Sequence, residues 1–324
     1  MGIVEDALNA IQEWFKGILA DGSLGCLEFT CSTLNNTFST SNKGVMKSLL
    51  SDNPSSFTGS TDASATPIWN SIETLTNNAI VPIAMFILVV ILIYELIYMV
   101  INDNSFRDFD TGIFFKWSVK AVCGIMLVSN VFYIATNVFA LGSKSVTSGL
   151  NTIFPAHGDF LNNTVKFSGA NSIKPKIRTN LMALDIPSLL VIIFLAFLVL
   201  LVTFIVLGAI IVVLSGRMIE IFMYLSIAPI PMATMMNNDW GQVGKNWLRN
   251  ILALAFQGFF IVVALTIFKT LLSNVVTQLA NLGGNNVKSA DIIGSMAIML
   301  GYIVALIFTI FRSSNISKSA FAAQ

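Results

Sequence analysis

The sequence predicts an all-α fold, a polytopic membrane helix bundle of about five spans with a proline-broken re-entrant segment. The first observation is composition, because 55% of the 324 residues are hydrophobic and 11% are charged, against about 25% charged in soluble domains. Mean hydropathy is +0.78. The second is a set of five apolar runs, each long enough to cross a bilayer. The third is a polar block with two prolines, from Arg217 to Asn250, between the third and fourth runs.

The first element is an N-terminal region, residues 1–78, which we expect outside the membrane. It begins with an amphipathic helix and contains a linker from Ser51 to Thr66 that is rich in Ser, Thr, Asp and Gly. The charges of the helix are mostly acidic, which argues against an anionic lipid surface and favours packing on another protein. Its apolar face is formed by Ile3, Val4, Ala7, Leu8, Ile11, Trp14, Phe15, Ile18 and Leu19.

The membrane spans follow from run length, because a bilayer core of about 30 Å takes about 20 helical residues. Two spans lie within residues 79–141, and three lie within a membrane core, residues 186–311. Between them we expect a long external loop, residues 142–185, folded with some short helices, and after them a short tail, residues 312–324. The five runs are Ala79–Ile101, Val119–Leu141, Ile186–Leu214, Leu248–Leu272 and Ile292–Phe311.

The block 217–247 is the candidate re-entrant segment. A continuous helix here is disfavoured because Pro229 and Pro231 remove two backbone donors and clash with the preceding turn. A helix from Arg217 to Ala228 rises only about 18 Å. We therefore expect a half-helix and a broken return, which membranes tolerate only where protein or water shelters the backbone.

Basic residues near the span ends predict the orientation. They follow the first span, flank the re-entrant block and occur in the tail. With five spans, these three segments all lie on the same side of the membrane. The positive-inside rule makes that side cytoplasmic, with the N-terminus outside the cell membrane and the C-terminus inside. Basic residues of the long loop oppose this, but charge in so long a loop orients less strongly. The supporting residues are Arg107, Lys116, Lys120, Arg217, Lys245, Arg249, Arg312 and Lys318.

Catalytic chemistry has little support in the sequence. There is no zinc motif, phosphate-binding loop or nucleophile elbow. His157 is isolated in an Asn-rich loop, and three cysteines with one histidine are too few for a typical metal site. A net charge of +1 excludes attraction of the whole protein to nucleic acid. We expect no enzyme, no cofactor and no metal.

Charge inside apolar segments is the stronger functional signal, because it is costly there and usually faces a bundle interior or a cavity. Arg217 and Glu220 are three residues apart, so they share a helix face on which they can pair. Such a pair either lets the half-helix enter the membrane or lines a translocation path. Glu95, near the end of the first span, either snorkels to the interface or belongs to the path.

Trp240 and Trp247 lie at the end of the re-entrant block and the start of the next span. Amphipathic rings favour the headgroup region, so they either anchor the protein at the interface or dock a partner. Lys245 and Arg249 are four residues apart and form a basic edge with these tryptophans on one predicted helix.

The block RMIEIFMYLSIAPIPMATMMNNDWGQVGKNWLRNILALAFQGFF resembles the core segment of TrbL-like (VirB-six-type) conjugal transfer proteins, in the version found in Gram-positive mobile elements. The resemblance lies in Arg-x-x-Glu at Arg217 and Glu220, Ala-Pro-x-Pro at Ala228 to Pro231, and the run from Trp240 to Trp247 that contains Gly244 and Lys245. The predicted layout of spans and long loop is also similar.

This resemblance implies a non-enzymatic channel and scaffold subunit of a type IV secretion machine. Such a subunit forms a homo-oligomer among membrane lipids, assembles with secretion ATPases and other membrane subunits, and helps translocate single-stranded DNA with its bound relaxase. Two alternatives remain. An ion or small-molecule transporter also uses broken helices, although no internal repeat supports it. A structural anchor of an envelope complex differs only in not touching the substrate.

Overall fold

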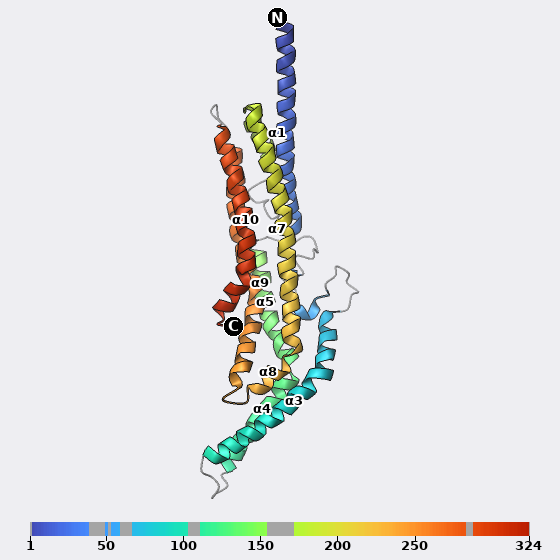
Figure 1. The fold of residues 1–324 in the computed structure, drawn as a ribbon, viewed down its shortest axis with the longest axis vertical. Coiled ribbons are helices and arrows are strands. Elements are labelled where there is room, and N and C mark those ends of the chain that lie inside the picture. The colour runs from blue at the N-terminus through green and yellow to red at the C-terminus, as the bar shows by residue number, and fades with distance from the viewer. Residues whose placement is uncertain are drawn as a thin grey trace. The chain divides into compact units, whose positions relative to one another are not determined.

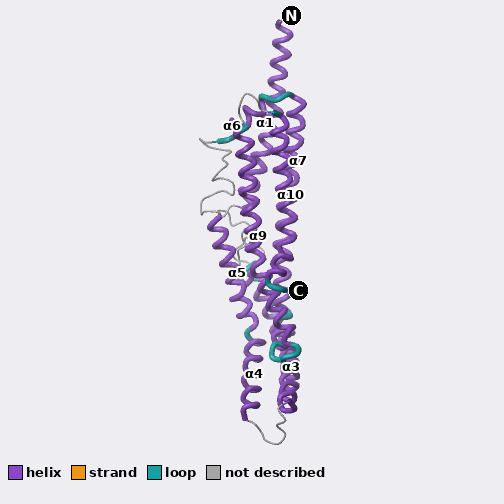
Figure 2. Tube along the Cα trace, turned by 90° about the vertical axis from the view of Figure 1, so that its left-hand side faces the viewer, coloured by secondary structure: helices purple, strands orange, loops and turns teal. Residues whose placement is uncertain are grey.

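The computed structural model describes residues 2–38, 49–50, 53–58, 67–102, 111–153, 172–282 and 288–323. All regular structure in these ranges is helical (Figure 2), which confirms the predicted all-α fold. The helices are α1 (Gly2–Phe38), η1 (Pro54–Ser56), α3 (Ile68–Asn102), α4 (Thr111–Ser129), α5 (Val131–Ile153), α6 (Lys174–Met182), α7 (Ile186–Ser226), α8 (Pro229–Thr234), α9 (Gly241–Asn281) and α10 (Ser289–Ala320) (Figure 1).

Four of these helices, α3, α7, α9 and α10, are long and apolar enough to cross a membrane, and the bent pair α4 and α5 makes a fifth candidate span. The chain is therefore a polytopic membrane bundle, as predicted. Helices α3, α7, α9 and α10 are each longer than the apolar run that predicted them. α10 continues to Ala320, so most of the segment expected as a short tail is helical. His157 and most of the predicted linker lie outside the described residues.

The second predicted span is not one continuous helix, because the chain bends by 66° between α4 and α5. The bend lies at Asn130, whose side-chain amide donates to the Met126 carbonyl at 2.9 Å. The Met126 carbonyl thus accepts from both the side chain and the backbone N–H of Asn130, the latter at 3.0 Å, and side-chain bonding to a carbonyl four residues earlier often bends a helix. The sequence prediction of a span over 119–141 did not include this bend.

The described chain packs as two compact units that do not follow the linear sequence. Unit 1 contains Met1–Met46, Gly149–Val213 and Ile261–Arg312, and unit 2 contains Lys47–Ser148, Leu214–Phe260 and Ser313–Gln324. Helices α5, α7, α9 and α10 therefore contribute residues to both units.

In unit 1, the second half of α1 packs along the apolar start of α7. The rings of Phe29 and Phe204 lie 6.1 Å apart, and a Cβ built on Gly22 would lie 2.9 Å from Ile193 Cδ1. The two helices therefore run in the same direction. The buried face of α1 contains Leu19, Leu24, Leu27, Cys31, Leu34 and Phe38.

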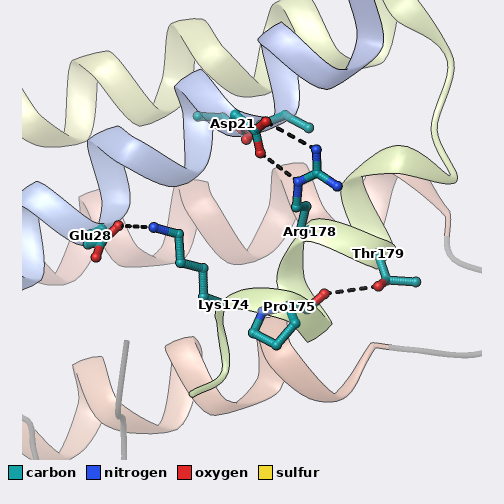
Figure 3. A network of polar contacts seen from close by, with 8 residues as sticks. Asp21, Glu28, Lys174, Pro175, Arg178 and Thr179 are labelled. Atoms are coloured by element: carbon teal, nitrogen blue, oxygen red, sulfur yellow. Dashed lines mark hydrogen bonds and ion pairs between the residues drawn. The ribbon is translucent and has the colours of Figure 1, made fainter. Parts of the chain in front are cut away.

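The short helix α6 is fixed to α1 by two ion pairs (Figure 3). Lys174 Nζ donates to Glu28 Oε2 at 2.6 Å. Arg178 donates to both carboxylate oxygens of Asp21, at 2.7 and 3.1 Å. These hydrogen bonds lower the pKa of Asp21 below its usual value. At the other end of α6, Asn180 Nδ2 donates to the Leu279 carbonyl of α9 at 3.2 Å.

The first half of α1 extends beyond the other helices of unit 1 (Figure 1). From Ala7 to Leu19, where its side chains are described, the predicted apolar face is solvent-accessible, with Ile11 62% and Trp14 67% exposed, up to the buried Leu19 at its end. The amphipathic helix is therefore present, but no described residue covers its apolar face.

Unit 2 is built on the hairpin of α3 and α4, against which α8 packs. Trp117 Nε1 of α4 donates to the Leu92 carbonyl of α3 at 2.8 Å. Trp69 of α3 meets Phe132 of α5 edge to face at 5.5 Å between ring centroids. These contacts fix the helices that surround the proline turn.

Candidate functional site

The candidate site is the proline junction, residues 217–247 of unit 2, where α7 ends and the chain turns through α8 into α9. α7 runs without a break from Ile186 through Arg217 to Ser226. α7 therefore continues beyond the end of the apolar run at Leu214, and residues 217–226 are the last part of α7 instead of a separate half-helix. Ser215 and Gly216 are not enough to end a helix that continues into another apolar segment.

The helix breaks at the prolines, and the backbone hydrogen bonds that the prolines cannot donate are replaced by donors one residue earlier in the chain. Pro229 and Pro231 have no N–H to give to the carbonyls of Leu225 and Ile227, four residues earlier. Those carbonyls accept instead from Ala228 N and Ile230 N, both at 3.1 Å. Pro229 and Pro231 then lie in the first turn of α8, where a missing N–H costs little.

Protein covers the irregular backbone of the junction, one of the two kinds of shelter that the sequence left open. Pro229, Pro231 and Thr234 are buried in α8, and α3 and α4 pack against this helix. The Thr234 hydroxyl donates to the Pro231 carbonyl at 2.7 Å. The proline junction is thus a packed turn of the protein interior.

The start of α9 approaches α8 very closely at Gly244. A Cβ built there would lie 2.1 Å from Met235 Cγ and 2.5 Å from the Pro231 carbonyl oxygen, so only glycine fits. Three residues later, Trp247 is 4% exposed, and its Nε1 donates to the Tyr224 carbonyl of α7 at 3.0 Å. Trp247 therefore joins α9 to α7, and the expectation that it anchors at the interface or docks a partner is wrong.

Glu95 is 2% exposed and connects three elements. Its carboxylate accepts from Lys120 Nζ of α4 and from Asn237 Nδ2 of the turn after α8, the latter at 3.3 Å. The Asn237 Oδ1 in turn accepts from the backbone of Asp239 and Trp240, at 2.7 and 2.9 Å. A buried carboxylate with these partners is inside the protein, so Glu95 does not snorkel.

Arg217 is 6% exposed and faces α9 instead of a carboxylate. Its Nε donates to the Leu254 carbonyl at 3.0 Å and its Nη2 to the Ala255 carbonyl at 3.4 Å. Its Nη1 is buried without a hydrogen bond. A Cβ built on Gly258 would lie 3.0 Å from this Nη1, so glycine leaves room for the guanidinium.

The predicted pair of Arg217 with Glu220 does not form. Glu220 Oε1 lies 2.9 Å from Lys318 Nζ at the end of α10. The two side chains leave α7 in different directions, because Arg217 turns inward to the carbonyls of α9 while Glu220 remains partly exposed. Their spacing predicted that they share a helix face. Their actual partners lie on α9 and α10, which are remote in sequence, so the spacing could not predict them.

The remaining candidates, Trp240, Lys245 and Arg249, are exposed. Lys245 and Arg249 are one helical turn apart, whereas Trp247 between them is buried. The predicted basic edge therefore exists without Trp247.

The described residues contain no group of three or more His, Cys, Asp or Glu that could bind a metal ion.

Sequence reasoning missed several residues that hold the junction together. Lys120 was assigned to the interface, although its opposite charge to Glu95 on the adjacent span was a usable signal. Asn237 precedes Trp240 and the start of α9, a position at which an Asn side chain often bonds to the following backbone. Lys318, which bonds Glu220, had no local signal.

Comparison with known proteins gives one informative result. A family model described as TrbL/VirB6 plasmid conjugal transfer like protein matches residues 50–229, more than half of the 324-residue chain. The match includes α3 to α7 and ends at Pro229. No curated protein matches the chain, and no solved structure matches it.

Proposed function

The chain belongs to the TrbL/VirB6 family of plasmid conjugal transfer like proteins, and from this premise we propose that it is a channel and scaffold subunit of a type IV secretion machine. It is a multi-pass membrane component of a conjugal transfer system. In the proposed role it has no enzymatic activity of its own and helps move single-stranded DNA with its relaxase across the cell membrane.

The observation that supports a scaffold role is the set of buried hydrogen bonds at the proline junction. Arg217 bonds to carbonyls of α9, and Glu95 bonds to α4 and to the turn after α8. Buried polar groups that form hydrogen bonds between helices hold those helices in a fixed arrangement. This supports Arg217, Glu220, Glu95, Pro229 and Pro231 as residues that shape the bundle.

The exposed first half of α1 supports the proposed partners. A face with several large apolar side chains about half exposed or more is unusual for an isolated protein and marks an interaction surface. We assign it to other membrane subunits of the machine and to neighbouring copies in a homo-oligomer. Trp240, Lys245 and Arg249 form a second, basic surface suited to secretion ATPases on the cytoplasmic side.

The proposed orientation places the N-terminus outside and the C-terminus in the cytoplasm. Five crossings, with α4 and α5 as one bent span, put the end of α3, the proline junction and the end of α10 on the same side. Lys120, Lys245, Arg249 and Lys318 then lie on the cytoplasmic side, in agreement with the positive-inside rule.

The test is deletion of the gene in a donor strain. We expect loss of plasmid or element transfer with unchanged donor growth, and recovery when the gene is supplied in trans. Photo-crosslinking during transfer should recover a secretion ATPase or single-stranded DNA on the protein. Normal transfer from the deletion strain, or solute uptake by the purified chain alone in proteoliposomes, would contradict the proposal.

A further inference from the structure

The polar stripe of α1 consists of Asp21, Gly25, Glu28, Ser32 and Asn36. These residues are spaced by three or four positions, so they share one face of the helix. Asp21, Gly25, Ser32 and Asn36 are exposed, and Glu28 is partly exposed. The opposite face is the buried apolar one. From Asp21 to Asn36 the stripe rises about 22 Å.

The depth of the stripe follows from its neighbour α7. The apolar run of this helix extends from Ile186 to Leu214, and a span takes about 20 residues. Every span placed inside that run contains residues 195–205, so Phe204 lies at bilayer depth. Phe29 is in contact with Phe204, with ring centroids 6.1 Å apart, so Phe29 and its neighbour Glu28 lie at bilayer depth as well.

Polar groups therefore occur at a depth where hydrocarbon would surround a lipid-facing helix. Glu28 and Lys174 form an ion pair at 2.6 Å, with 32% and 45% of their side chains exposed. A second pair, Asp21 of α1 and Arg178 of α6, is 54% and 47% exposed and lies level with Ile193, outside residues 195–205. The charges of Glu28 and Lys174, which lie at bilayer depth, face a bundle interior or a water-filled cavity, because exposure to lipid is costly.

We propose that the polar stripe of α1, together with α6, lines a water-filled passage at bilayer depth. Lipid fits the adjacent face of α7, because Phe197, Leu201 and Phe204 are spaced by three or four positions and are 56%, 47% and 50% exposed. The passage rests on the proposed function, in which the subunit helps to move a hydrated, charged substrate across the membrane.

Cysteine accessibility tests this passage in the assembled machine. The background carries Cys26→Ser, Cys31→Ala and Cys123→Ser, and each test variant adds one cysteine. Ser32→Cys and Thr179→Cys probe the stripe and α6, and both positions are exposed. Phe197→Cys and Leu201→Cys are the controls, on the apolar exposed face of α7 and within residues 195–205. The probe is a charged, membrane-impermeant methanethiosulfonate, added to intact cells and to inverted membrane vesicles.

We expect Ser32→Cys and Thr179→Cys to react at least about tenfold faster than the two α7 controls. Plasmid transfer by the unlabelled variants checks that they fold and assemble. Labelling of Ser32→Cys should then reduce transfer. Unreactive Ser32→Cys from both sides would overturn the passage, because the stripe would be covered by protein or lipid. Equal reaction of Phe197→Cys would also overturn it, because this level would then lie outside the bilayer.

These outcomes are separable from failure of the proposed function. If deletion of the gene abolishes transfer while Ser32→Cys remains unreactive, the passage is wrong and the conjugation role stands. If Ser32→Cys reacts as expected while the deletion strain transfers normally, the water-filled surface stands and its assignment to conjugation is wrong.

Discussion

At the scale of single residues, Arg217 shows how backbone carbonyls can accommodate a charge in a membrane protein, since no ion pair links it to a described carboxylate. Its guanidinium bonds to two carbonyl oxygens of α9, which already accept helical hydrogen bonds and have a second lone pair available. Glu220, three residues later, is used differently, in a partly exposed pair with Lys318. The two residues therefore differ in what their removal should cost.

Replacing Arg217 by Ala should lower the free energy of unfolding by about 2–4 kcal/mol, because it removes two buried hydrogen bonds and leaves a cavity. Glu220→Ala should cost at most about 1 kcal/mol, as for other partly exposed ion pairs. Denaturant unfolding of the purified protein in detergent measures both, and plasmid transfer should fall with Arg217→Ala. Equal losses for the two variants would show that Arg217 does not hold α7 to α9.

At the scale of secondary-structure elements, close approach explains Gly244 in the proline junction. α9 meets α8 at Gly244, where a Cβ would overlap both the Met235 side chain and the Pro231 carbonyl oxygen. The side chain of Met235 can move, but the backbone of α8 is held by α3 and α4. Gly216, also helical and in unit 2, has no atom within 4 Å of a built Cβ.

Gly244→Ala should therefore destabilise the protein by about 1–3 kcal/mol, the usual cost of overpacking. Gly216→Ala is the matched control, and we expect it to be neutral or to stabilise by up to about 1 kcal/mol, because alanine favours helix. Thermal unfolding in detergent distinguishes the two variants. An unchanged midpoint for Gly244→Ala would mean that α8 yields to the methyl group and that the contact is not restrictive.

At the scale of the whole molecule, the exposed first half of α1 should govern assembly without affecting insertion. Trp14→Glu places a charge on the apolar face, whereas Gln12→Glu places the same charge elsewhere on the exposed helix. We expect Trp14→Glu to reduce co-purification of the other machine subunits about tenfold, as at an interface hot spot. Gln12→Glu should have little effect, and both variants should reach the membrane equally. Equal co-purification would exclude this face from assembly.

The sequence predicted what depends on local composition. Span number and fold class follow from run length, and the position of the chain reversal follows from Pro229 and Pro231. It did not predict the partners of Arg217 and Trp247, because these lie on helices 37 and 23 positions away in the chain. Residue spacing predicts which side chains share a helix face. Whether such a side chain is buried, and what it bonds to, depends on which helix packs against that face.

The hydrogen bonds of Arg217 also impose an order on biosynthesis. Its acceptors on α9 are synthesised 37 residues later, and a guanidinium remains charged throughout, since it does not lose its proton in proteins. When α7 leaves the ribosome, its end therefore has no acceptor in the membrane. That end must wait at the insertion machinery or in water until α9 emerges, so the two helices enter the bilayer as a pair.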